Sequence, residues 1–333
     1  MTATALAPAA TGRQINIARY RDLSLIPVLI LLLIVGRFVD DAFFTSKNLL
    51  NVTLAQTELG LIVLAESLVL IVGKFDLSLE STIGFAPAVG IVLVVPEAAG
   101  GLGTEWPGAL AIPICLAVGA LVGAFNGLLI LRFKLSAFIV TLGMLIMLRG
   151  LMTGVTEGKS LFELPDGFSY LGNTKWFGVR AAIWLVGILY ALGIVLLTWF
   201  RHGRALYAIG GNEDAARAAG IRTTRITWIV FILAGVLGAF AGVLMTGRLG
   251  SVGAAQGDGM IFLVFAAAVI GGISLDGGKG TLFGALCGVW MLGLITNILT
   301  FGGVDARWLK AIYGAIILVA LVITRITSGK AQD

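Results

Sequence analysis

Long runs of apolar residues, separated by short polar segments, dominate the chain. A helix needs about 20 apolar residues to cross the hydrocarbon core of a bilayer, and about ten runs approach that length. They cover residues 23–39, 52–72, 81–95, 109–131, 137–152, 181–200, 226–245, 260–272, 281–301 and 309–323. The pattern predicts about ten membrane spans. The turns after Val72 and Gly272 are tight, so these places are either broken helices or simple hairpins.

Composition agrees with this pattern. Of the 333 residues, 58% are hydrophobic and 12% are charged, and the mean hydropathy is +1.01. Soluble domains have about 25% charged residues, and a water-soluble fold has too little interior to hide this much apolar surface. The 46 glycines suit membrane helices that pack through small residues. We therefore predict an all-α fold, a polytopic transmembrane helical bundle in a lipid bilayer.

The charged residues indicate how the chain is oriented. Cytoplasmic loops carry an excess of Lys and Arg, and the densest basic cluster lies in residues 201–225. The first apolar run ends without a small-x-small cleavage site, so we interpret it as a retained anchor. We expect a cytoplasmic segment at 1–22, a transmembrane permease-like domain at 23–326 and a cytoplasmic tail at 327–333. An even number of spans then leaves both termini cytoplasmic.

Two glycine stripes suggest an internal repeat. Glycines recur at a spacing of four in the fourth and the ninth apolar runs, which lie five crossings apart and therefore run in opposite directions. The stripes are Gly119, Gly123 and Gly127, and Gly280, Gly284 and Gly288. An inverted repeat of five plus five helices, common in transport folds, would produce this pattern. Chance in a glycine-rich chain would produce it equally well, and both explanations stay open.

The basic segment 201–225 contains a complete short helix. Asn212 is suited to cap its start, and Glu213 and Asp214 complement the positive end of the helix dipole. Glu213 and Arg217 form an i,i+4 pair with the acid first, and Gly220 suits the left-handed residue that ends a helix. So short a helix is not stable alone in water. It either docks against a partner or is an ordinary solvated loop helix.

Several polar side chains lie within the apolar runs. Glu66 is deep inside the second run, where a charge must face the protein interior or a wet cavity. Asp76 and Ser78 follow the end of that run, while Asn126 and Asn297 lie within the fourth and ninth. All five are candidates for a translocation path. The alternatives are a buried protonated acid at Glu66, a structural turn at Asp76, and asparagines that join helices.

The sequence offers no catalytic, metal or cofactor chemistry. Cys115 and Cys287 lie inside apolar runs, and His202 has no Cys near it, so neither a disulfide framework nor a metal-ligand spacing exists. The stretch from Gly277 to Thr281 lacks the first glycine and the Ser or Thr of a phosphate-binding loop. The Lys and Arg residues form no stripe that tracks nucleic acid. We expect no metal, no cofactor and no nucleotide site in this chain.

Several motifs together resemble one family. The segment from Ala208 to Ile221 is similar to the cytoplasmic coupling loop of ribose-type (monosaccharide) ABC transporter permeases of the bacterial inner membrane. Stretches from Gly73 to Ser81, from Ala124 to Met144 and from Val269 to Thr281 match the same family. The resemblance assigns ATPase coupling to one group of residues. These are Gly211, Asn212, Glu213, Asp214, Ala215, Ala216, Arg217 and Gly220.

The resemblance also implies partners. It implies an ABC ATPase subunit, a periplasmic or lipoprotein sugar-binding protein, and a second permease copy, identical or related. The cargo would be a monosaccharide or a related small polyol. Lys74 and Glu80 stand where the family more often has glycine, which leaves the substrate preference open. The alternative function is an ion-coupled secondary transporter with Glu66 as the relay, but it leaves the 212–220 helix unexplained.

Overall fold

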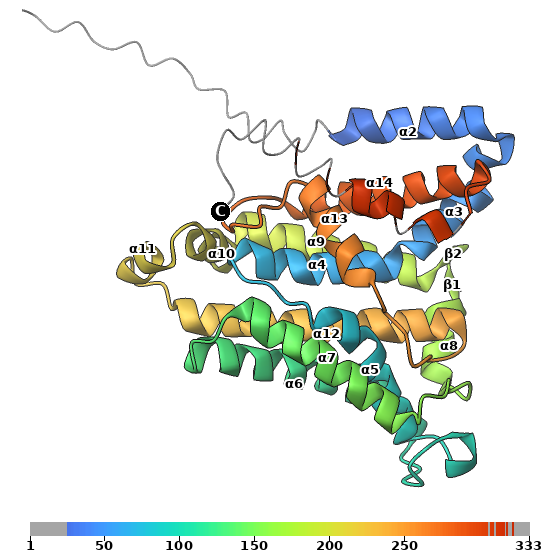
Figure 1. Ribbon diagram of the computed structural model, residues 1–333, viewed down its shortest axis with the longest axis horizontal. Helices are drawn as coiled ribbons and strands as arrows, with labels where there is room; N and C mark the ends of the chain where they lie inside the picture. The colour runs from blue at the N-terminus through green and yellow to red at the C-terminus, as the bar shows by residue number, and fades with distance from the viewer. Residues whose placement is uncertain (1–24, 306, 310, 317, 319–321, 323–333) are drawn as a thin grey trace, which may run out of the picture.

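The helical bundle in Figure 1 is the architecture of the computed structural model, which describes residues 25–305, 307–309, 311–316, 318 and 322. Most of these residues are helical, and most helices run along one common axis (Figure 1). The expected terminal segments 1–22 and 327–333 lie outside the described residues, as does much of the tenth apolar run. The predicted all-α bundle is confirmed for the part described.

Among the described residues, five helices are long and apolar enough to cross a membrane. They are α6 (Ala111–Arg132, with the 3-10 turn before it), α7 (Ala137–Val155), α9 (Ala181–Trp199), α12 (Thr223–Leu249) and α14 (Leu282–Phe301). A sixth span is formed if α3 (Ser46–Ala55) and α4 (Thr57–Ile71), bent by 43° at their junction, count as one. The predicted number of ten is not confirmed.

Much of the tenth run lies outside the described residues, and the rest of the difference comes from three apolar runs that form shorter helices. They are α2 (Leu25–Val39), α5 (Leu79–Val92) and α13 (Met260–Ile270), of 15, 14 and 11 residues. At a rise of about 1.5 Å per residue, α5 and α13 are shorter than a full bilayer crossing, whereas α2 begins at Leu25, the first described residue. An apolar run therefore does not reveal that its helix begins or ends inside the bundle.

Shorter elements close the two ends of the bundle. At one end lie α10 (Arg201–Gly211) and α11 (Glu213–Ala218). At the other lie α8 (Asp166–Asn173), the hairpin of β1 (Lys175–Trp176) and β2 (Val179–Arg180), and three 3-10 turns. The turns are η2 (Asp41–Phe44), η3 (Glu97–Ala99) and η4 (Gly108–Leu110). We call these the inner end and the outer end, following the basic cluster that predicts the cytoplasmic side.

Helix α12 lies at the centre of the bundle and contacts α4, α5, α6 and α8. The contact with α6 is close because glycines line it: a Cβ at Gly119 would lie 2.3 Å from the Gly235 carbonyl oxygen. The second glycine stripe packs elsewhere, with the Cβ position of Gly288 2.0 Å from the carbonyl oxygen of Ala267 in α13. The two stripes thus have different partners, and the inverted repeat stays a prediction.

The chain folds back into the bundle after α4. That helix ends at Ile71, and the Asp76 N–H then reaches the Glu66 carboxylate of the same helix, at 3.3 Å. Helix α5 consequently begins inside the bundle (Figure 1). The other doubtful place, residues 271–281, is a compact turn in which the Ser274 N–H donates to the Lys279 carbonyl oxygen at 3.1 Å. After the first break the chain therefore continues inside the bundle, and the second break is a glycine-rich turn.

Candidate translocation and coupling sites

Helices α10 and α11, which we call the coupling unit, project at the inner end (Figure 1). The local predictions for α11 are confirmed. The Asn212 side chain accepts the Ala215 N–H at 2.9 Å, and the Arg217 guanidinium binds the Glu213 carboxylate at 2.8 Å. Gly220 has φ +83°, the left-handed conformation that ends the helix. Ala216 is buried, whereas the side chain of Asp214 is 94% exposed, so α11 presents a polar face to solvent.

Bare backbone joins the coupling unit to the rest of the inner end. Gly210 of α10 meets Gly73, Gly277 and Gly278, which lie in two loops, in what we call the glycine junction. A Cβ at Gly210 would lie 1.9 Å from the Ile71 carbonyl oxygen, and one at Gly277 would lie 2.7 Å from the Gly73 Cα. The Gly278 N–H donates to the Ile71 carbonyl oxygen at 2.9 Å. Only glycine permits so close an approach of three segments.

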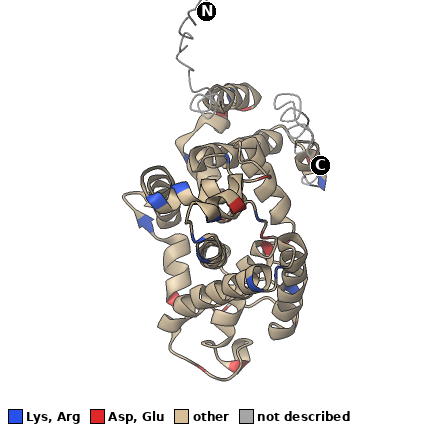
Figure 2. Cartoon of the chain, turned by 90° about the vertical axis from the view of Figure 1, so that its left-hand side faces the viewer, with Lys and Arg blue, Asp and Glu red and all other residues tan. Residues whose placement is uncertain are grey.

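Two side-chain contacts reinforce this junction. The Lys74 ammonium lies 3.5 Å from the Glu213 carboxylate, and the Tyr207 hydroxyl donates to the Gly280 carbonyl oxygen at 2.9 Å. Lys74, which replaces the glycine more common in the family, therefore connects the end of α4 to α11. Figure 2 looks onto the inner end and shows Lys and Arg residues distributed around it. Such a distribution is typical of a cytoplasmic surface.

Four of the predicted path residues meet in one place, the buried polar cluster of Glu66, Asp76, Ser78 and Asn126. The Asp76 carboxylate accepts the Ser78 hydroxyl at 2.5 Å and the Asn126 amide at 3.3 Å, and that amide also donates to the Ser78 hydroxyl at 2.8 Å. All four side chains are buried. The second Glu66 oxygen and the Asn126 amide oxygen have no hydrogen-bond partner among the described residues. The cluster therefore retains unused acceptors.

Asn297, the fifth predicted path residue, lies apart from this cluster. Its side chain exchanges hydrogen bonds with that of Asn48, at 2.8 and 3.2 Å, and so joins α14 to α3. This is how asparagine commonly holds membrane helices together. The structure brings four of the five residues together and leaves Asn297 between two other helices.

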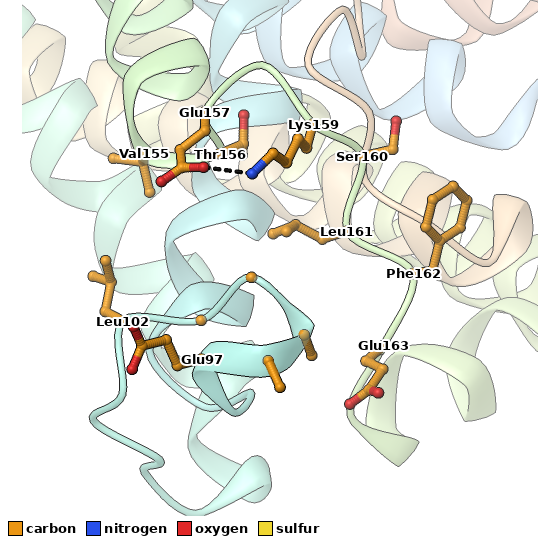
Figure 3. A pocket seen from close by; sticks show the side chains of 14 residues that line it. Glu97, Leu102, Val155, Thr156, Glu157, Lys159, Ser160, Leu161, Phe162 and Glu163 are labelled. Carbon is orange, nitrogen blue, oxygen red and sulfur yellow. Dashed lines mark hydrogen bonds and ion pairs between the residues drawn. The ribbon is translucent and has the colours of Figure 1, made fainter.

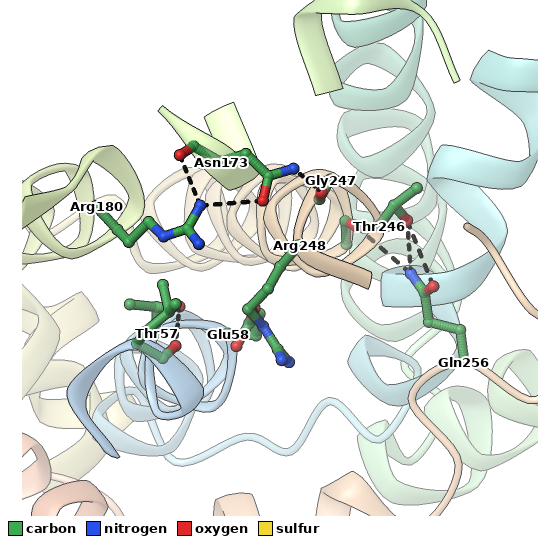
Figure 4. A network of polar contacts seen from close by, with 10 residues as sticks. Thr57, Glu58, Asn173, Arg180, Thr246, Gly247, Arg248 and Gln256 are labelled. Carbon is green, nitrogen blue, oxygen red and sulfur yellow. Dashed lines mark hydrogen bonds and ion pairs between the residues drawn. The ribbon is translucent and has the colours of Figure 1, made fainter. Parts of the chain in front are cut away.

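Charged side chains tie the outer end together (Figure 4). Arg248, at the end of α12, donates to the buried Glu58 carboxylate of α4 at 2.7 Å. Asn173 of α8 donates to the Gly247 carbonyl oxygen at 3.1 Å and accepts the Arg180 guanidinium at 3.0 Å. Buried Glu58 is an acid inside the second apolar run that the sequence analysis did not single out.

An open pocket of 740 Å³ lies at the outer end (Figure 3). Residues 97–102, 155–157 and 159–163 line it. Lys159 binds the exposed Glu157 carboxylate at 2.6 Å and thereby lowers the pKa of Glu157. Glu97 and Glu163 line the pocket from two different segments (Figure 3), and Lys159 is the basic residue among the lining residues. The pocket is consequently a predominantly acidic hollow.

The sequence analysis also did not single out a third group of charged residues, which surrounds Arg149. Arg149 lies inside an apolar run, and this was the signal available. Its guanidinium lies 3.5 Å from Glu80 and 3.8 Å from Asp258, and it donates to the Gln256 carbonyl oxygen at 2.9 Å. Glu80 is buried and also accepts the Ile261 N–H at 3.0 Å, near the start of α13. These contacts connect α5, α7 and α13.

Comparison with known proteins decides the family. The model of the family "Branched-chain amino acid transport system / permease component" matches residues 48–321. The ribose import permease protein of Escherichia coli K12 is 35% identical over 305 residues, which cover 90% of this chain and 92% of that protein. The chain belongs to this permease family. The predicted resemblance to ribose-type ABC permeases is confirmed.

Other relatives agree. An autoinducer 2 import system permease protein of Klebsiella pneumoniae is 36% identical over 309 residues, covering 92% of this chain and 87% of its own length. The ribose import permease protein of Haemophilus influenzae is 32% identical over 298 residues, covering 88% and 90%. The chain is thus a multi-pass membrane permease of the ABC importer type, a transport subunit and not an enzyme. These relatives favour it over the ion-coupled alternative.

Proposed function

We propose that this permease carries a monosaccharide or a related small polyol through the inner (plasma) membrane of a bacterium, driven by a partner ABC ATPase. The relatives named as ribose and autoinducer 2 import permeases support a small polyhydroxylated cargo. The basic inner end supports a cytoplasmic position for the coupling unit and for both termini. A second permease copy, identical or related, would complete the path.

The coupling unit carries this proposal. Helix α11 is capped at both ends, exposes Asp214, and is joined through the glycine junction to α4, the helix that carries Glu66. A helix of six residues is not stable by itself in water. Docking in a cleft of the ATPase supplies the missing contacts. A movement of α11 would then displace α4, because the two are connected through direct backbone contacts without flexible side chains between them.

The two ends would serve different partners. The ATPase docks on the inner end, and a periplasmic or lipoprotein sugar-binding protein delivers its cargo to the outer end. The acidic pocket of 740 Å³ supports a role for the outer loops in that contact. Its carboxylates would attract basic residues of the binding protein and raise the rate of encounter.

The buried polar cluster is our proposed contact for cargo inside the bundle. Its unpaired Glu66 and Asn126 oxygens would accept sugar hydroxyls once the helices reorient, since in this conformation the cluster is closed to solvent. Asn126→Leu should therefore reduce uptake at saturating substrate without preventing assembly with the ATPase. Asn297 stays a proposed path residue, although its amide already pairs with Asn48.

Reconstitution tests the function as a whole. Proteoliposomes containing the permease, its ATPase and the binding protein should accumulate radiolabelled sugar when ATP is supplied on the ATPase side. Uptake should continue after ionophores collapse the proton and sodium gradients. Uptake that stops with those gradients and ignores ATP would overturn the proposal and support ion coupling.

A charge reversal tests the coupling unit. Asp214→Arg changes an exposed carboxylate and leaves the cap at Asn212 intact, so the permease should still insert while the ATPase no longer co-purifies. Glu105→Arg is the matched control, because Glu105 is exposed at the outer end. Equal recovery of the ATPase with both variants would contradict the assignment of α11.

A further inference from the structure

We propose that a second pocket at the outer end binds the head group of an anionic phospholipid, whose acyl chains lie against apolar residues of α3 and α9. The pocket has a volume of 230 Å³. It is formed by α3, by the β1–β2 hairpin and by the start of α9, and α3 contacts α9 directly. Figure 1 shows α3 and the hairpin at the same end of the bundle. The site concerns the surrounding membrane and is independent of the cargo.

The charge of this pocket matches an anionic ligand. Three basic side chains, Lys47, Lys175 and Arg180, line it, and its described lining residues include no acid. Membrane orientation does not explain these cations, because the excess of Lys and Arg belongs on the cytoplasmic side and not at the outer end. Basic pockets between membrane helices bind lipid head groups. The three cations therefore favour a phosphate-bearing head group.

The cations are accessible to a ligand. Lys47 and Lys175 are exposed, and their ammonium groups have no hydrogen bond or ion pair to any other described residue. Arg180 is anchored through Nη1, which donates to the backbone and side-chain oxygens of Asn173 at 2.6 and 3.0 Å (Figure 4). Its Nε and Nη2 have no partner among the described residues, and neither is fully buried. An anchored guanidinium with free donors suits a phosphate group.

The pocket has an apolar part as well as a cationic part. Lys47, Leu50 and Leu54 lie three and four positions apart, so they share one face of α3. Leu54 lies about 10 Å farther along the helix from the outer end than Lys47. Ile183, in the first turn of α9, adds apolar surface. Cations toward the surface and apolar residues below them follow the order of a phospholipid, whereas a soluble anion would use only the cationic part.

Aromatic rings on the hairpin indicate that the pocket lies at the membrane surface. Phe177 is 97% exposed, and its ring meets that of Trp184 edge-on, with centroids 6.4 Å apart. The Trp184 Nε1 donates to the Trp176 carbonyl oxygen at 3.1 Å, which joins the start of α9 to the hairpin. Tryptophans gather at the level of the lipid head groups, where an amphipathic ring has both apolar and polar surroundings. A lipid at this level has its phosphate beside the three cations.

The acidic pocket at the same end belongs to other segments. Glu97 and Glu163 line it, and none of its lining residues lines the basic pocket (Figure 3). Carboxylates repel an anionic head group. The outer end is thus divided into an acidic part, suited to a basic soluble partner, and a basic part, suited to lipid.

Photo-cross-linking in nanodiscs tests the lipid site. The full-length permease is placed in phosphatidylcholine nanodiscs that contain a small fraction of phosphatidylglycerol with a diazirine in one acyl chain. Irradiation should label peptides that contain residues 47–54 and 175–183. Lys47→Glu combined with Lys175→Glu should reduce this labelling at least about tenfold, since each cation near the membrane surface strengthens binding of anionic lipid roughly fivefold. Lys47→Gln combined with Lys175→Gln, which should have the same effect, replaces this variant if the charge reversals prevent insertion.

The matched control is Lys159→Glu combined with Arg307→Glu, which changes the net charge equally at two exposed cations outside the pocket. This control should leave the labelling unchanged. Phosphatidylcholine with the same diazirine chain should label these peptides at least about tenfold less, because its head group has no net charge. Equal labelling by the two lipids, or labelling that the pocket variants do not reduce, would overturn the site. Loss of labelling in millimolar inorganic phosphate at constant ionic strength would assign the pocket to a soluble anion and overturn the lipid.

Discussion

The inner and outer ends of this bundle are held together in opposite ways. At the inner end, α10 and two loops meet through glycines, and the Cβ position of Gly210 falls 1.9 Å from the Ile71 carbonyl oxygen. At the outer end, the contacts are side chains, such as Arg248 on Glu58 and Asn173 on Gly247. Direct backbone contacts transmit a displacement from one segment to the next, whereas ion pairs between side chains can separate and re-form. We therefore call the glycine junction the relay, because it is a rigid connection that transmits movement. We call the contact between Glu58 and Arg248 the clasp, because it is a connection that can open.

The largest expected effect breaks the relay. Gly210→Ala inserts a methyl group where the Ile71 carbonyl oxygen lies, so α10 must move away from α4 and uptake should fall at least about tenfold. Gly187→Ala in α9 is the control, since its Cβ position also has nothing within 4 Å and no role is assigned to it. Uptake and ATP hydrolysis in proteoliposomes measure the effect. Equal activity of the two variants would show that the junction transmits nothing.

The next effect weakens the clasp. Glu58→Gln leaves the Arg248 guanidinium without its buried counter-charge and should lower the free energy of unfolding by about 2 kcal/mol. The melting temperature in detergent measures this change. The control is Glu157→Gln, which removes a solvent-exposed pair with Lys159 and should leave the melting temperature unchanged. A similar melting temperature for both variants would remove the distinction between buried and exposed pairs.

A smaller effect is expected at the cap of α11. Asn212→Ala removes the acceptor for the Ala215 N–H, which costs about 1 kcal/mol of helix stability and should weaken ATPase binding about fivefold. Asn212→Asp retains a cap and should bind nearly as well as the unaltered chain. Binding is measured by titrating the purified ATPase onto immobilised permease. Loss of affinity in Asn212→Asp as well would point to a direct contact of Asn212 with the ATPase.

The smallest effect sharpens the comparison between the two ends. Lys74→Met removes the ion pair with Glu213 but keeps the glycine junction, and a partly exposed pair contributes only about 0.5 kcal/mol. ATP-driven uptake should fall less than about twofold. A fall as large as that of Gly210→Ala would assign the relay to this charge pair instead of to the backbone contacts.

Local features of the coupling unit followed from the sequence. The cap at Asn212, the Glu213–Arg217 pair and the left-handed Gly220 involve residues at most a few positions apart, so local rules suffice to predict them. Membrane residence followed as directly from composition. The family followed from several motifs occurring together. Each of these predictions depends either on short stretches of sequence or on the average composition of the whole chain.

Features that depend on tertiary packing could not be predicted from the sequence. The fold-back that brings Asp76 to Glu66 is set by packing against α12, and no local signal shows that α5 begins inside the bundle. Glu58 and Arg248 are 190 positions apart in the sequence, so their pairing was not visible. Arg149 could have been found from the sequence, because a charged residue inside an apolar run indicates a buried or functional position. The sequence analysis considered Glu66 on this ground but not Arg149.

A photo-cross-linking experiment tests the central claim most directly. A benzophenone amino acid is placed either at Asp214 in α11 or at Phe177 in the outer hairpin, both highly exposed. The assembled transporter is then irradiated and the products are identified by mass spectrometry. The account predicts that position 214 cross-links to the ATPase and position 177 does not. Cross-linking of the ATPase at position 177, with none at 214, would contradict it.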